Sequence, residues 1–358
     1  MSGLLHTSVT FGALQLPNRI IMAPLTRMRA PNSIPTEMMA IYYGQRASAG
    51  LIISEATPIS PQGVGYPSTP GIWNEAQIQA WRKITHAVHE KNGRIVLQLW
   101  HVGRISHPDF HDGALPVAPS AITPKGDAIT PTGMKPFVTP RALASDELPG
   151  IIAAYRLAAK NALAAGFDGV EIHAANGYLL DQFLRDGSNQ RTDQYGGSLE
   201  NRSRLLLEVT RAVIEVCGAE RVGIRLSPSG TFNDMADSNP EAIFGYVLAE
   251  LSGFKLAYLH LVDALEGDIR HGAKVIDLKV LRKAYQGNLI ICGGYDQDRA
   301  ETVLSNGMAD AVAFGQWYIA NPDLVERFRQ HAGINSPDVN SFYGGDEKGY
   351  IDYPSLAG

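Results

Sequence analysis

The sequence predicts an α/β protein, a single (β/α)8 barrel, on the basis of two observations. Eight short apolar or β-branched runs alternate with eight amphipathic segments along the chain. Seven of those runs lack the polar alternation of a half-buried strand, as expected for parallel strands covered on both faces. A closed barrel accounts for every strand and helix of this alternation, so we expect one domain over residues 1–358.

Each predicted strand is a short apolar run that ends where polar, glycine or proline residues begin. In chain order the strands are expected at 19–25, 50–55, 94–100, 169–173, 221–226, 257–262, 289–292 and 311–314. Each predicted helix follows one strand and has an apolar face at helical spacing. The helices are expected at 36–49, 75–91, 148–165, 199–216, 240–251, 277–285, 298–305 and 322–331. Glycine stands where several of them should end, as in Asn92-Gly93 and Asn306-Gly307, because it readily adopts the left-handed conformation that ends a helix.

A doubly wound sheet is the alternative architecture, since it also alternates strands with helices. Against it, no predicted strand is followed by a G-x-G-x-x-G or G-x-x-x-x-G-K-[ST] string. The nearest string, at 63–68, lacks the third glycine and does not open a helix. The barrel is therefore favoured.

The segment 101–145 interrupts the regular alternation. It joins the third strand to the third helix and is rich in proline, glycine and threonine. Long loops at the C-terminal face of a barrel usually shape or cover a site. We therefore expect this segment to be an active-site capping loop within the single domain.

The composition excludes several classes of protein. The chain is 45% hydrophobic and 19% charged, which excludes disorder as its main state. Its formal net charge is −5 and its Lys and Arg residues are scattered, so the basic surface of a nucleic-acid binder is missing. No apolar run approaches the ~18 residues of a membrane span, and the first residues lack a signal peptide. We expect a cytoplasmic protein without nucleic-acid or membrane partners.

The cysteine and histidine residues do not indicate a metal centre. Cys217 and Cys292 lie far apart, each inside an apolar run, which fits a reducing compartment. They exclude a disulfide framework, a Cys-rich zinc site and a four-Cys iron–sulfur cluster. His86 and His89 have the spacing of a metal pair on a helix, but no third ligand accompanies them. We expect no metal.

The residues just past the strands indicate the kind of ligand, because these positions line the active site of a (β/α)8 barrel. They are rich in neutral hydrogen-bonding groups and poor in carboxylates. Neither the paired carboxylates of a glycosidase nor a lone Schiff-base lysine after the sixth strand is evident. A set of neutral hydrogen-bonding groups at the strand ends suits a bound heteroaromatic group.

Glycines at the ends of the last two strands indicate a phosphate. Gly293, Gly294 and Gly315, with Gln316 after them, stand where many barrels bind phosphate through backbone N–H groups. The alternative is that glycine simply makes the turn. Arg225 ends the fifth strand, where it either faces a ligand or forms a buried ion pair. Together these residues point to a phosphorylated cofactor.

The exit of the fourth strand carries the clearest chemistry. His173 and Asn176 can both donate to one oxygen, and Tyr178 brings a phenol to the same cavity. A carbonyl held by two donors beside a neutral acid is what a developing enolate needs. The alternative is a core histidine packed against a structural tyrosine.

Seven motifs in combination carry a family resemblance that extends nearly end to end. They lie at 18–27, 71–73, 98–104, 173–184, 193–202, 321–324 and 352–354. With them the chain resembles the old yellow enzyme family of flavin-dependent ene-reductases. The resemblance implies a tightly but non-covalently bound FMN at the mouth of the barrel.

The resemblance also implies site residues. It assigns to FMN the residues Pro24, Leu25, Thr26, Ala56, Gln98, Arg225, Gly293, Gly294, Gly315 and Gln316. Within this set Thr26 would face flavin C4=O and N5, Gln98 the pyrimidine edge, and Arg225 the N1 and C2=O side. The substrate pocket would be walled by Tyr66, Trp100 and Tyr343, next to His173 and Asn176. Gln316 departs from the family, which usually has Arg there on the FMN phosphate.

The activity implied is an ene-reductase that takes hydride from NAD(P)H, with NADPH the expected donor. Hydride would pass from flavin N5 to the β carbon of an α,β-unsaturated carbonyl or nitro compound, and Tyr178 would protonate the α carbon. The expected partners are small activated alkenes, and the expected assembly is a monomer or small homo-oligomer. Two alternatives stay open: a non-redox phosphate-binding barrel acting as lyase or isomerase, and a non-catalytic flavin-binding protein.

Overall fold

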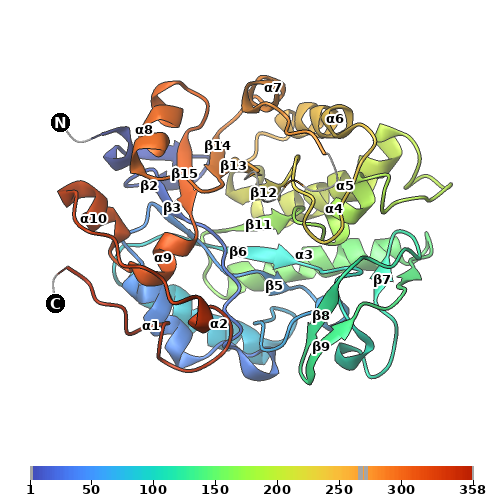
Figure 1. Ribbon diagram of the computed structural model, residues 1–358, viewed down its shortest axis with the longest axis horizontal. Coiled ribbons are helices and arrows are strands. Elements are labelled where there is room, and N and C mark those ends of the chain that lie inside the picture. The colour runs from blue at the N-terminus through green and yellow to red at the C-terminus, as the bar shows by residue number, and fades with distance from the viewer. Residues whose placement is uncertain (1–2, 265–268, 270–272, 357–358) are drawn as a thin grey trace.

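Eight parallel strands close into a barrel in the computed structural model, which describes residues 3–264, 269 and 273–356. The strands are β3 (Ile20–Met22), β4 (Leu51–Ile53), β6 (Ile95–Trp100), β11 (Gly169–His173), β12 (Val222–Leu226), β13 (Tyr258–Val262), β14 (Leu289–Cys292) and β15 (Ala311–Phe314). Pairing of β15 with β3 and of β6 with β11 completes the ring. The predicted (β/α)8 barrel is confirmed, and it lies at the centre of Figure 1.

Helices surround the barrel in the predicted order. They are α1 (Glu37–Gln45), α2 (Glu75–His89), α3 (Leu148–Ala164), α5 (Leu199–Cys217), α6 (Pro240–Ser252), α7 (Leu278–Ala284), α8 (Gln297–Ser305) and α10 (Leu324–Gln330). Local capping explains several of the starts: the Asn74 side chain accepts a hydrogen bond from the Gln77 N–H at α2, and Ser198 accepts one from Asn201 at α5. None of the helices among the described residues is long and apolar enough to cross a membrane.

Several short elements have no counterpart in the predicted alternation. Two are helices, α4 (Leu179–Leu184) and α9 (Gln316–Ala320), and a third is the two-residue strand β5 (Thr57–Pro58) beside β6. The hairpin of β1 (Val9–Phe11) and β2 (Leu14–Leu16) precedes the barrel, and its buried side chains pack with those that fill the barrel interior. Elements this short carry too few residues for a periodic pattern.

The capping segment 101–145 contains strands of its own. Its β8 (Asp127–Thr130) and β9 (Gly133–Pro136) form an antiparallel hairpin, and β7 (Val117–Ala118) pairs with β10 (Arg141–Ala142). In Figure 1 the hairpin stands away from the barrel strands on the side of β6 and β5. The segment is thus partly ordered by backbone pairing.

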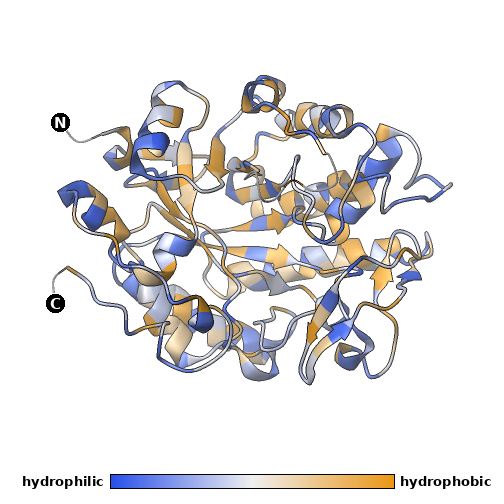
Figure 2. Ribbon diagram, viewed as in Figure 1, coloured by the Kyte–Doolittle hydropathy of each residue, from blue (hydrophilic) through white to orange (hydrophobic). Residues whose placement is uncertain are grey.

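Apolar side chains form two layers of core. The larger cluster lies between the barrel and its helices, and a second cluster, which includes Ile21, Leu51, Val96 and Ile290, fills the barrel interior. Figure 2 shows the hydrophobic colours gathered on the barrel strands. Strands buried on both faces explain why the runs lack polar alternation.

Candidate active site

A pocket of about 520 Å³ opens at the C-terminal ends of the barrel strands. The predicted site residues that line it are Pro24, Leu25, Thr26, Tyr66, Tyr178, Gln316 and Tyr343. The other predicted residues lie outside its lining: Ala56, Gln98, Trp100, His173, Asn176, Arg225, Gly293, Gly294 and Gly315. The fold therefore brings residues from the first, second, fourth and last strand–helix units, and from the C-terminal segment, to one cavity.

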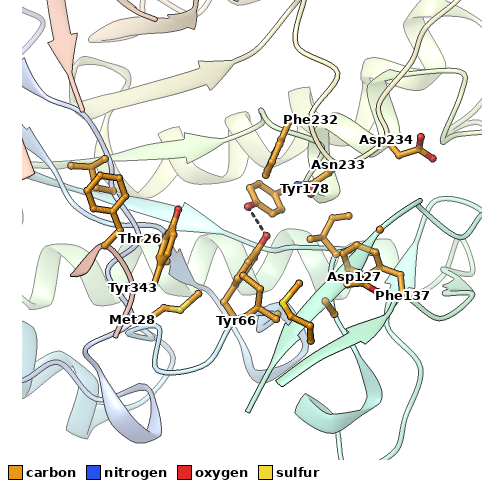
Figure 3. A pocket seen from close by; sticks show the side chains of 18 of the residues that line it. Thr26, Met28, Tyr66, Asp127, Phe137, Tyr178, Phe232, Asn233, Asp234 and Tyr343 are labelled. Atoms are coloured by element: carbon orange, nitrogen blue, oxygen red, sulfur yellow. Dashed lines mark hydrogen bonds between the residues drawn. The ribbon is translucent and has the colours of Figure 1, made fainter. Parts of the chain in front are cut away.

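Two aromatic rings of the pocket lining, Tyr66 and Tyr178, pack against two rings outside it, Trp100 and His173. The Trp100 ring stacks on Tyr66 at 5.5 Å between centroids and on His173 at 6.3 Å. Tyr178 stands edge-on to Trp100 and His173, at 4.9 and 5.0 Å. The Tyr178 hydroxyl lies 3.2 Å from the Tyr66 hydroxyl, as the dashed line in Figure 3 shows. The two phenols thus share one hydrogen bond inside the pocket.

A tight turn after β11 places Tyr178. Asn176 and Gly177 both have positive φ, 57° and 77°, and a Cβ on Gly177 would lie 2.7 Å from the Asn233 Cβ. The backbone of Asn176 is held on both sides, because its N–H donates to Ser227 Oγ and its C=O accepts from Asn233 Nδ2. Glycine at 177 is required by both the conformation and the close approach.

Tyr178 is a neutral phenol at the pocket wall. Its side chain is buried, with 8% exposed, and burial raises its pKa well above the usual value, with a further contribution from Tyr66. A phenol that keeps its proton at neutral pH can donate that proton only to a strongly basic partner, such as an enolate carbon. Tyr178 therefore fits the part of a proton donor.

His173 is held as a neutral imidazole. Burial lowers its pKa well below the usual value, and Arg225 and His260 lower it further. Its Nδ1 accepts a hydrogen bond from the Ala175 N–H at 3.3 Å, so the proton resides on Nε2. The ring thus retains one N–H donor for a ligand.

The two side chains predicted at the pyrimidine edge have different partners. Gln98 donates from Nε2 to Glu171 Oε1 at 2.7 Å, which leaves its carbonyl oxygen for another contact. Arg225 donates from Nη2 to the Cys292 sulfur at 3.5 Å. The partner of Arg225 is a thiol rather than the carboxylate of the ion pair considered as an alternative.

The predicted phosphate loop contains a turn that only glycine can make. Gly293 has φ of 132°, and a Cβ there would lie 2.1 Å from the Asp263 carbonyl oxygen. Gln316 begins α9 with an exposed side chain that lines the pocket. A guanidinium that the sequence did not indicate reaches the same turn, since Arg299 Nη1 donates to the Gly294 carbonyl at 2.8 Å.

Most pocket residues outside the predicted set come from two segments. The loop after β12 supplies Phe232, Asn233 and Asp234, and the capping segment supplies 125–129, Met134 and Phe137. Figure 3 shows Phe232 beside Tyr178, and Asp127 and Phe137 on the β8–β9 side. The loop residues lie several positions beyond the strand end, so a search confined to strand ends does not reach them.

A buried cluster anchors the segment that carries Tyr343. Arg27 donates to the carbonyl oxygens of Phe342 and Gly349, at 2.9 and 3.0 Å. The Arg27 backbone N–H also donates to Glu55, whose other oxygen accepts from the Tyr43 hydroxyl at 3.2 Å. Tyr343 itself is 60% exposed at the pocket rim, so its position depends on this anchor.

Replacing Glu55 with Gln is expected to remove one contribution to the unfolding free energy that decreases as pH rises. Burial raises the pKa of Glu55 from 4.5 to about 7, although hydrogen bonds from Arg27 and Tyr43 oppose the shift. The folded chain therefore keeps a proton that the unfolded chain releases, and the contribution of Glu55 to the unfolding free energy falls as pH rises from 4.5 to about 7. The loss amounts to at most ~3 kcal/mol and stays constant at higher pH.

Urea unfolding at several pH values across this window measures the difference. The exposed Glu37→Gln variant is the control, because Glu37 pairs with Lys83 on the surface. Parallel pH profiles for wild type and Glu55→Gln would contradict the expectation.

Comparison with known proteins gives the family. The model of the NADH:flavin oxidoreductase / NADH oxidase family matches residues 5–335. The chain belongs to this family, that of old yellow enzyme. It is 47% identical to 12-oxophytodienoate reductase 1 of Oryza sativa subsp. japonica, over 98% of this chain and 93% of the relative.

Solved structures agree with the family assignment. Morphinone reductase is 52% identical with a TM-score of 0.94, covering 99% of this chain and 97% of that one. The old yellow enzyme homologue from Zymomonas mobilis is 46% identical with a TM-score of 0.96, covering 98% and 99%. Another morphinone reductase structure holds tetrahydroNAD. This flavoprotein is accordingly an NAD(P)H-dependent flavin oxidoreductase with FMN as its cofactor.

The residues at the barrel mouth fit FMN in their donor chemistry. Arg225 Nε and Trp100 Nε1 are buried and have no hydrogen-bond partner within the part of the chain that the structure describes. Buried donors normally find a partner, so a polar ligand beside them is expected. A cation at Arg225 suits the negative charge of a reduced flavin.

Proposed function

We propose that this flavoprotein is an ene-reductase that reduces alkenes conjugated to a carbonyl or nitro group. The observation that carries the proposal is the pairing of a neutral phenol, Tyr178, with a neutral imidazole donor, His173, at 5.0 Å between rings. Bound FMN supplies the hydride chemistry, accepting hydride from a nicotinamide and delivering it to the β carbon of the alkene. Tyr178 then supplies the proton that the α carbon needs.

His173 and Asn176 hold the oxygen of the substrate. The Nε2–H of His173 is the donor that remains once Nδ1 has accepted from Ala175. The Asn176 side chain is half-buried at the end of β11, on a backbone clamped by Ser227 and Asn233. Two preorganised donors stabilise the negative charge that develops on this oxygen as hydride arrives. Because Tyr178 stands at the pocket wall, we expect proton and hydride on opposite faces, a trans addition.

Aromatic side chains and the capping segment set the substrate range. Tyr66 and Tyr343 provide aromatic walls, Trp100 stacks on Tyr66, and residues 125–129 of the segment 101–145 also line the pocket. The cavity of about 520 Å³ is also lined by Thr26 and Gln316, which are assigned to FMN, so the space left for a substrate suits small molecules. Small activated alkenes are therefore the proposed substrates.

Visible spectroscopy tests the function directly. The purified protein is expected to be yellow, to bleach when NADPH is added without oxygen, and to regain its colour when cyclohexenone follows. A colourless protein would favour non-redox phosphate chemistry, and a yellow protein that does not bleach would favour flavin binding without turnover. Bleaching without reoxidation by any activated alkene would contradict the proposed substrate class.

The Gln316→Arg variant is expected to bind FMN roughly five- to thirty-fold more tightly, a change of about 1–2 kcal/mol. Gln316 is exposed and lines the pocket, and Arg would offer a charged fork to phosphate where Gln offers a neutral amide. Alkene turnover by the FMN-loaded variant should stay near that of wild type. The measurement is the rise in flavin fluorescence on dilution, since fluorescence increases as FMN is released.

Arg299→Ala is the matched variant for this experiment. The Arg299 guanidinium already reaches the Gly294 carbonyl, so it can supply the positive charge that Gln316 lacks. In that case Arg299→Ala releases FMN faster than wild type, and Gln316→Arg restores retention in the double variant. If Gln316→Arg releases FMN as fast as wild type, either Gln316 does not contact the phosphate or another cation, such as Arg299, already neutralises it.

A further inference from the structure

One buried chain of contacts links both side chains of the proposed pyrimidine edge. It starts at Gln98 on β6, which donates to Glu171 on β11 at 2.7 Å. Glu171 Oε2 lies 3.0 Å from His260 Nδ1 on β13. Arg225 on β12 donates to the sulfur of Cys292 on β14, and in strand register Arg225 lies beside His260. Five neighbouring barrel strands therefore contribute to one inward-facing cluster.

Two buried nitrogen atoms of the cluster have no hydrogen-bond partner among the described residues. They are His260 Nε2 and Arg225 Nε. Cys292 is only 6% exposed and ends β14 immediately before the Gly293 turn. The thiol thus lies beside the Arg225 guanidinium and next to the proposed phosphate loop.

The charges around Cys292 favour its ionised form. Burial by itself would raise the pKa of the thiol, but His260 and Arg225 lower it to about 7. Burial also opposes a charged His260, yet Glu171 and Cys292 raise the pKa of that imidazole. The titratable and charged groups facing this cluster from the packed elements are Arg225, His260, Glu171, His173, Tyr258 and the hydrogen-bonded pair Tyr295–Asp263.

We propose that Cys292 is a positioning residue: its sulfur holds the Arg225 guanidinium at the end of β12 and shares charge with it beside the pyrimidine edge of FMN. The inference rests on the proposed placement of FMN. A guanidinium that is restrained before the flavin binds loses less freedom on binding. A thiolate beside it also reduces the net positive charge that stabilises a reduced flavin.

Cys217 shows that this arrangement is not a general property of buried cysteine. It lies at the end of α5 among apolar side chains of the outer core, and burial raises the pKa of its thiol to about 11. Cys217 acts as a small apolar residue, whereas Cys292 has a hydrogen-bonded cation. Cys217→Ala is therefore a matched control for the loss of a buried thiol.

The first test measures FMN binding by the apoprotein of Cys292→Ala, Cys292→Ser and Cys217→Ala. Removing the acceptor of the Arg225 hydrogen bond is expected to weaken FMN binding about tenfold in Cys292→Ala. The serine hydroxyl can accept the same bond, so Cys292→Ser should stay within about threefold of wild type, as should Cys217→Ala. Equal losses in the alanine and serine variants, or no loss in either, would overturn the positioning role.

The second test follows the midpoint potential of bound FMN from about pH 6 to 8, the range in which a thiol of this character titrates. A thiolate near the flavin adds a negative charge, so the wild-type potential should fall more steeply through this range than that of Cys292→Ser. Cys217→Ala should keep the wild-type profile. If the midpoint potential of wild type and of Cys292→Ser changes with pH in the same way, the proposal that Cys292 shares charge with Arg225 is wrong.

Ultraviolet thiolate absorbance of the apoprotein gives a readout independent of the loaded enzyme. In the Cys217→Ala background, Cys292 is expected to ionise near neutral pH, and Arg225→Met should move that ionisation to higher pH. An ionisation unchanged by Arg225→Met would contradict the contact. Failure of the proposed function is distinguishable, because wild-type protein would then bind no FMN or fail to reduce alkenes while the thiol still titrated.

Discussion

Alkene reduction by the Tyr178→Phe variant is expected to fall by a factor of about 10² or more, while reduction of FMN by NADPH continues near its wild-type rate. Phenylalanine keeps the ring that packs edge-on to Trp100 and His173, so the pocket wall survives. Only the proton donor is lost. Stopped-flow measurement of the two half-reactions separates these effects.

Tyr66→Phe is the matched control, since the Tyr66 hydroxyl lies 3.2 Å from that of Tyr178 and either could carry the proton. We expect the Tyr66 variant to lose less than about tenfold in the alkene half-reaction, because it removes a hydrogen-bond partner and not the donor. A larger loss of alkene reduction in Tyr66→Phe than in Tyr178→Phe would make Tyr66, rather than Tyr178, the proton donor. Equal losses in both half-reactions of Tyr178→Phe would indicate a structural role instead.

His173→Ala is expected to weaken the binding of phenolic ligands such as p-hydroxybenzaldehyde by roughly ten- to 150-fold. A phenolate oxygen resembles the enolate oxygen of the reaction, and losing one charge-assisted donor costs about 1.5–3 kcal/mol. The measurement is the long-wavelength charge-transfer band that forms when the phenolate lies over the flavin. A titration curve unchanged from wild type would remove His173 from the oxygen-binding site.

Two further variants separate donor loss from packing loss. His173 also stacks on Trp100, so His173→Ala removes ring contacts as well as a donor. His173→Gln retains an N–H donor and most of the volume, and it should recover part of the binding. Asn176→Ala should lose a comparable amount, because Asn176 is the proposed second donor. A full loss in His173→Gln would assign the effect to packing.

Sequence patterns predicted the bounds of the barrel strands closely but did not predict the accessory elements. The strands β11, β14 and β15 fall at the predicted residues, because burial on both faces produces a local apolar run. The range 36–49 overshoots α1, which ends at Gln45 before the turn that returns the chain to β4. The helix α4 was missed because its residues, 179–184, are buried on every side and show no amphipathic face.

The candidate site likewise contains residues that the sequence predicted and residues that it did not. The ends of the strands can be predicted from the sequence, so Thr26, Tyr178 and Gln316 could be assigned to one cavity. All three line the pocket. Phe232 and Phe137 could not, because the path of a long loop depends on what it packs against. The anchoring of Tyr343 by Arg27 joins residues more than 300 positions apart and leaves no local signal.

By itself, the sequence determined the order of strands and helices, the residues at the strand exits and the resemblance to a flavin-dependent family, because these depend on local patterns of burial and motif. Only the tertiary structure decided which of those residues touch. Arg225 meets Cys292 across 67 positions, and Glu171 meets His260 across 89. Such contacts follow from the register of neighbouring strands and the closure of the barrel, and neither is a property of any single segment.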